Sequence, residues 1–189
     1  MTDKTQLKED IAFVRAAAER LETRSVPAIY LLWALLGGVG FVMVDFVDDY
    51  SWIGTYWLFA GPIGFVLSMW LGMRASRSAG VRDRQTGVRH SLHWLSFMTA
   101  GLLGLALVSA GQLTWAGFGS LWVLLLGLTY FHGGLYIERR MMPIGILTAA
   151  AYLVTVWVPG FGWTTAGVVL AIALVTGAVL GAPKRETAS

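Results

Sequence analysis

The sequence contains no cysteine among its 189 residues. Disulfide bonds, thiolate metal sites and cysteine nucleophiles are therefore excluded for this chain. Charged residues are also scarce: they make up 13% of the chain, against about a quarter in typical soluble domains. Hydrophobic residues make up 56%. This composition predicts an integral membrane protein.

Four long stretches lack Asp, Glu, Lys and Arg. They hold 20, 24, 48 and 43 residues, and they lie between Arg24 and Asp45, Asp49 and Arg74, Arg89 and Glu138, and Arg140 and Lys184. One membrane-spanning helix needs about 20 apolar residues. The two longer stretches are interrupted at 111–117 and 159–162, where glycine and proline favour turns. We therefore predict an all-α fold with six transmembrane helices arranged as three hairpins, near 26–45, 52–73, 91–110, 117–137, 143–158 and 164–182.

The basic residues predict the topology of this bundle. Six spans place 1–25, 74–90, 138–142 and the 183–189 tail on one side of the membrane. All 14 Lys and Arg residues lie in these segments. Cytoplasmic loops carry such an excess of positive charge, so both termini are expected in the cytoplasm. We expect a multi-pass protein of a bacterial inner (plasma) membrane, anchored by its first span without a cleaved signal peptide.

Residues 1–25 are predicted to form a cytoplasmic amphipathic helix. Its apolar residues repeat at intervals of four and three, as in a heptad seam; they are Leu7, Ile11, Val14, Ala18 and Leu21. Two heptads are in most cases too short for a stable isolated coiled coil. The seam therefore either packs on the bundle or headgroup layer, or pairs with a partner protein or a second copy.

The 74–90 segment is predicted to be a basic cytoplasmic loop. Its arginines are Arg74, Arg77, Arg82, Arg84 and Arg89. Arginines beside a membrane span favour anionic lipid headgroups. The same charges are also explained by topology alone, and both interpretations stay open. The basic balance does not indicate nucleic-acid binding, because a membrane protein needs these charges for orientation.

Small residues four apart follow two of the predicted spans and favour close helix packing. These packing residues are Ala60, Gly64, Ser68 and Gly72 in the second span, and Ala173, Gly177 and Gly181 in the sixth. They are expected to pack inside the monomer or at a dimer interface.

Two histidines are the candidate cofactor ligands. His93 and His132 lie in consecutive spans, and the polar stripes that carry them are expected to face the bundle. Histidines on facing helices hold haem in many membrane bundles, so a b-type haem is an open alternative. Hydrogen bonding to tyrosine, serine or backbone carbonyls is the simpler interpretation. No cofactor and no metal site are predicted.

No catalytic motif occurs in the sequence. H-E-x-x-H, a Walker loop and G-x-S-x-G are all missing, and we expect no catalytic residues. The predicted function is that of a non-enzymatic accessory, regulatory or scaffold subunit, which acts through a partner or self-association. A small channel for an uncharged solute, with a kink at Pro62, and a haem or metal electron carrier are the alternatives.

Overall fold

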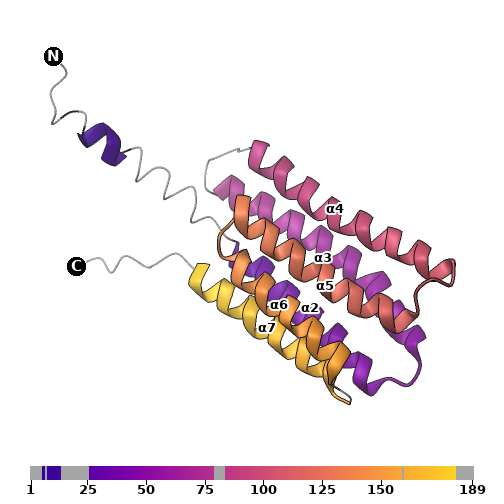
Figure 1. The fold of residues 1–189 in the computed structure, drawn as a ribbon. Coiled ribbons are helices and arrows are strands. Elements are labelled where there is room, and N and C mark those ends of the chain that lie inside the picture. The colour runs from indigo at the N-terminus through magenta and orange to yellow at the C-terminus, as the bar shows by residue number, and fades with distance from the viewer. Residues whose placement is uncertain (1–5, 7, 14–25, 79–83, 159, 182–189) are drawn as a thin grey trace.

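The computed structural model describes residues 6, 8–13, 26–78, 84–158 and 160–181. Six long helices run side by side through this part of the chain (Figure 1). They are α2 (Pro27–Phe46), α3 (Tyr50–Ser78), α4 (Arg84–Ser109), α5 (Trp115–Tyr136), α6 (Met141–Trp157) and α7 (Gly162–Gly181). The all-α prediction is confirmed, and one of these helices lies at each predicted span.

Five helices are long and apolar enough to cross a membrane: α2, α3, α4, α5 and α7. The chain is thus a candidate multi-pass membrane protein by helix length and composition. α6 has 17 residues, or about 25 Å at 1.5 Å per residue, which is shorter than a hydrocarbon layer of about 30 Å. The sixth crossing therefore stays a prediction.

The turns predicted from glycine and proline lie where helices end. Gly111 and Gly160 have φ angles of 69° and 83°, in the left-handed region that glycine adopts without a steric penalty. Gly111 lies between α4 and α5, and Gly160 between α6 and α7. Gly111 thus lies in the turn of the predicted second hairpin, and Gly160 lies in the turn of the predicted third hairpin.

The prediction of a loop over 74–90 needs correction, because most of this segment is helical. α3 continues to Ser78 and α4 begins at Arg84. Arginine has a high helix propensity, and no proline interrupts either end. The polar composition led us to predict a loop, although a helix that leaves the membrane can be polar on all sides. Only 79–83 lies outside the described residues between these two helices.

The helices pack in an order that differs from their order in the sequence. Among the described residues, helix contacts join α3 to α2, α2 to α7, α7 to α6, α6 to α5, and α5 to α4. Each predicted hairpin therefore packs as a pair, and α2 closes on α7. α3 and α4 occupy the two ends of the row, with no Cα pair between them within 8 Å in the described part of the chain.

The core lies among α2, α5, α6 and α7. Tyr30 and Phe41 from α2, Val123 from α5, Ile144 from α6 and Leu174 from α7 are buried in one cluster. α5 and α6 approach each other closely, because glycines occupy their contact. A Cβ atom added at Gly127 would lie 2.7 Å from the backbone nitrogen of Ala149.

The structure describes only part of the predicted amphipathic helix. Residues 8–13 are helical, and Ile11 is 57% exposed. Leu7, Val14, Ala18 and Leu21 lie outside the described residues, so the heptad seam stays a prediction.

Candidate functional site

Polar side chains gather at one end of the bundle, where α2, α4 and α6 begin and α5 ends. His93 on α4 is buried at 6% exposure. Its Nδ1 atom forms a 2.5 Å hydrogen bond with the hydroxyl of Tyr136 on α5. The ring also packs edge-on against Tyr136 and Trp94. His93 therefore joins α4 to α5 near the end of the bundle.

The other ring nitrogen of His93 faces the contact between α5 and α6. A Cβ atom built on Gly133 would lie 3.0 Å from His93 Nε2 and 3.1 Å from Met141 Sδ. The Nε2 atom is buried, and no atom of the described residues lies in hydrogen-bonding geometry to it, although the backbone of Thr129 faces the same ring. The absence of a side chain at Gly133 thus leaves room for the imidazole ring of His93 between α4 and α5.

His132 has different surroundings. Its side chain is exposed, and Nδ1 lies 2.8 Å from the carbonyl oxygen of Leu128 on the same helix. The expectation that its polar stripe faces the bundle does not hold for this residue. Within the described part of the chain, no group of three His, Asp or Glu residues is suitably placed for a metal ion. A haem held by His93 and His132 stays a hypothesis.

A second polar contact joins α2 to the α5–α6 turn. The hydroxyl of Tyr30 donates a 2.9 Å hydrogen bond to Oε2 of Glu138. Burial raises the pKa of the Glu138 carboxyl, although this hydrogen bond and the positive charge of Arg140 both act to lower it. The other carboxyl oxygen, Oε1, is buried and has no hydrogen-bond partner in the part of the chain that the structure describes. Sequence reasoning missed this pair because its members are 108 positions apart.

At the opposite end of the bundle, Asp45 caps a neighbouring helix. Its Oδ2 atom accepts a 2.6 Å hydrogen bond from the backbone nitrogen of Thr164, in the first turn of α7. The first N–H groups of a helix lack partners inside the helix, and a carboxylate there also meets the positive end of the helix dipole. A hydrogen bond thus joins α2 to α7 at this end of the bundle.

The predicted small-residue stripe of α3 packs against α2. Ala60 is 7% exposed, and a Cβ atom added at Gly64 would meet Leu36 and Trp33. Ser68 Oγ accepts a 3.0 Å hydrogen bond from Trp33 Nε1. Gly72 is different, because a Cβ atom there would meet nothing within 4 Å.

The predicted stripe of α7 also lies inside the bundle. Ala173 is 4% exposed. A Cβ atom on Gly177 would lie 3.0 Å from Ile144 and 3.6 Å from Tyr30. Gly181 is the last residue of α7. Both stripes thus supply contacts within one chain.

Four of the five predicted headgroup arginines lie on the helical ends of α3 and α4. Arg74 is placed over the ring of Trp70, with its guanidinium carbon 5.4 Å from the ring centroid. Arg77 and Arg89 are exposed. Arg84 is the first residue of α4, and Arg82 lies outside the described residues.

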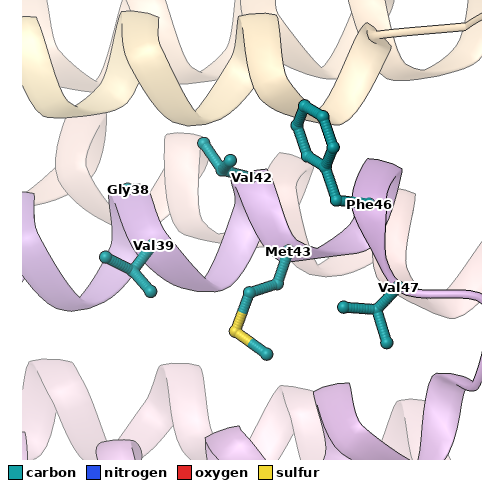
Figure 2. Close-up of a pocket in the computed structure, with 6 residues that line it drawn as sticks. All are labelled: Gly38, Val39, Val42, Met43, Phe46 and Val47. Carbon is teal, nitrogen blue, oxygen red and sulfur yellow. The ribbon is translucent and has the colours of Figure 1, made fainter.

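An apolar groove of about 430 Å³ lies along α2. Figure 2 shows its lining residues, with Val39, Met43 and Val47 extending to one side of the helix and Val42 and Phe46 to the other. The lining of the groove is almost entirely apolar. It therefore does not resemble a path for a polar solute.

Comparison with known proteins adds no family to this description. No protein-family model, curated protein or solved structure matches the chain.

Proposed function

We propose that this protein is a non-enzymatic membrane subunit that binds another membrane helix, from a partner protein or a second copy, through the free side of α3. The observation that carries the proposal is a second face of small residues on α3, separate from the stripe that packs on α2. α3 is also the least buried candidate span, with 11% of its apolar window buried.

Glycine defines this free face. Gly54, Gly61 and Gly72 are 7 and 11 residues apart, which is close to two and three helical turns, so the three share one side of α3. A Cβ atom at any of them would meet nothing within 4 Å. Leu58 and Phe65 lie near the same side and are 68% and 51% exposed. We call these five residues the glycine face.

The glycine face has the chemistry of a helix-packing surface. Glycine inside a helix costs about 1 kcal/mol relative to alanine, and in the described part of the chain no neighbouring atom comes close enough to exclude a Cβ atom at these three positions. Small residues let a second helix approach until backbone and side-chain contacts stabilise the pair, because lipid supplies little hydrophobic drive. The exposed Leu58 and Phe65 side chains provide further contact area beside the glycines, Leu58 between Gly54 and Gly61 along the helix and Phe65 between Gly61 and Gly72.

Photo-crosslinking in the native membrane tests this function. A photoreactive residue replaces Phe65 in one variant and Val168, 46% exposed on α7, in a matched control. We expect a discrete protein adduct from position 65 that Gly61→Leu abolishes, while position 168 yields lipid adducts alone. Equal protein adducts from both positions, or none from position 65, would reject the glycine face as an interface.

The 1–25 helix is proposed to strengthen the same association. Deletion of residues 2–24 should then weaken the adduct from position 65 while the bundle still inserts. An unchanged adduct would assign the association to α3 alone.

A further inference from the structure

α3 and α4 are both longer than a typical hydrocarbon layer is thick. α3 has 29 residues and is about 43 Å long at 1.5 Å per residue, against a hydrocarbon thickness of about 30 Å. α4 has 26 residues and begins at Arg84, seven residues before the predicted span. Both extensions are on the predicted cytoplasmic side, at the depth of the lipid headgroups.

The extension of α3 presents its arginines on one side. Trp70, Arg74 and Arg77 are four and three residues apart, so they follow one stripe of the helix. Arg74 lies over the Trp70 ring at 5.4 Å, a cation–π contact that restricts the position of the guanidinium group. Gly72 is two residues from Trp70, about half a turn away, so this stripe and the glycine face are on opposite sides of α3.

The α4 extension supplies a further arginine, 12 positions after Arg77 in the chain. Arg89 is exposed, and Ser78 and Arg84 are joined by six peptide links, which reach at most about 22 Å. α3 and α4 themselves share no Cα pair within 8 Å in the described residues. Exposed apolar side chains lie next to the arginines, namely Met73 (50%) on α3 and Leu92 (60%) on α4.

We propose that these two helix ends bind an anionic phospholipid from the leaflet on their side of the membrane. Arg74, Arg77 and Arg89 hold the phosphate group, and the acyl chains lie along Met73 and Leu92. Guanidinium groups pair with phosphate through two parallel hydrogen bonds, and each basic residue near the surface adds to the attraction for anionic lipid. A zwitterionic lipid binds less well, because its ammonium group is repelled by the same arginines.

Native mass spectrometry of the full-length protein in detergent tests this site. The probes are phosphatidylglycerol and phosphatidylcholine with identical acyl chains. The test variant is Arg74→Gln/Arg77→Gln/Arg89→Gln. The matched control is Arg139→Gln/Lys184→Gln/Arg185→Gln, which removes the same charge from the same predicted side but outside α3 and α4.

We expect wild type and the control to retain phosphatidylglycerol in preference to phosphatidylcholine, and the test variant to lose at least tenfold in phosphatidylglycerol affinity. An equal loss in both triple variants would mean diffuse attraction to total charge and would overturn the site. Equal retention of the two lipids by wild type would overturn it as well.

Two further variants keep the test decisive if the glutamine variant inserts poorly. Arg74→Lys/Arg77→Lys/Arg89→Lys keeps the charge that orients the helices but removes the bidentate geometry, and should lose severalfold in affinity. Trp70→Leu removes the ring beneath Arg74 and should also weaken binding. Wild-type affinity in both variants would contradict the assignment. The outcome is separable from the proposed function, because none of these residues belongs to the glycine face.

Discussion

Polar residues far apart in the sequence join the helices at both ends of the bundle. Tyr30 reaches Glu138 at one end, and Asp45 reaches the backbone of Thr164 at the other. The sequence shows only that these residues lie near the ends of apolar stretches. Their partners are set by the closure of α2 on α7 and by the position of the α5–α6 turn, so sequence periodicity could not predict them.

Glu138 should make stability depend on pH. Its pKa is raised by burial above its ordinary value near 4.5. The folded state then holds a proton that the unfolded state has released, so the free energy of unfolding falls as pH rises from about 4.5 towards the folded-state pKa. Glu138→Gln should remove this part of the slope, as measured by thermal unfolding in detergent across a pH series. Identical slopes for wild type and variant would contradict the effect.

Asp45 should stabilise the start of α7. Asp45→Ala leaves the Thr164 N–H without its partner and should cost about 1 kcal/mol of unfolding free energy, the usual cost of losing a helix cap. Asp48→Ala is the matched control, because Asp48 is exposed in the next turn of the chain. Chemical unfolding followed by circular dichroism compares the two. Equal losses would show that the capping contact contributes nothing.

At the scale of helices, the sequence predicted positions well, but it did not indicate the contacts of α2 with α7 and of α5 with α6. Uncharged stretches and turn residues located all six helices to within a few residues at most ends. The largest differences are the basic ends of α3 and α4, where a polar helix resembles a loop in composition. The stripe around Gly64 was visible as a packing surface, but nothing in its spacing indicated Trp33 and Leu36 of α2 as the residues that fill it.

The α5–α6 contact should depend on glycine. Gly127→Ala places a Cβ atom 2.7 Å from the Ala149 backbone nitrogen, and backbone cannot move aside as a flexible side chain can. We expect a loss of about 1–3 kcal/mol, the range for overpacking, although alanine favours the helix. Gly87→Ala on α4, where a Cβ atom meets nothing within 4 Å, should be neutral or slightly stabilising. Thermal unfolding in detergent measures both. A stable Gly127→Ala variant would contradict the packing.

At the scale of the whole molecule, the helices form an open row that ends in α3 and α4. These two helices follow each other in the chain but share no Cα pair within 8 Å in the described residues. The arrangement leaves one side of α3 for the proposed partner, and the lipid proposal assigns the basic ends of both helices to the headgroup layer. Both proposals depend on six crossings with the basic segments on one side, which helix length supports for five helices and leaves open for α6.

Cysteine labelling tests that topology most directly, since the chain contains no cysteine of its own. Single variants Asp48→Cys, Gln112→Cys, Val158→Cys, Ser76→Cys and Arg139→Cys are treated in intact cells with a membrane-impermeant maleimide. Six crossings predict that positions 48, 112 and 158 react from outside, and that positions 76 and 139 react only after the membrane is opened. Reaction of positions 139 and 158 from the same side would show that α6 does not cross, and would contradict the account.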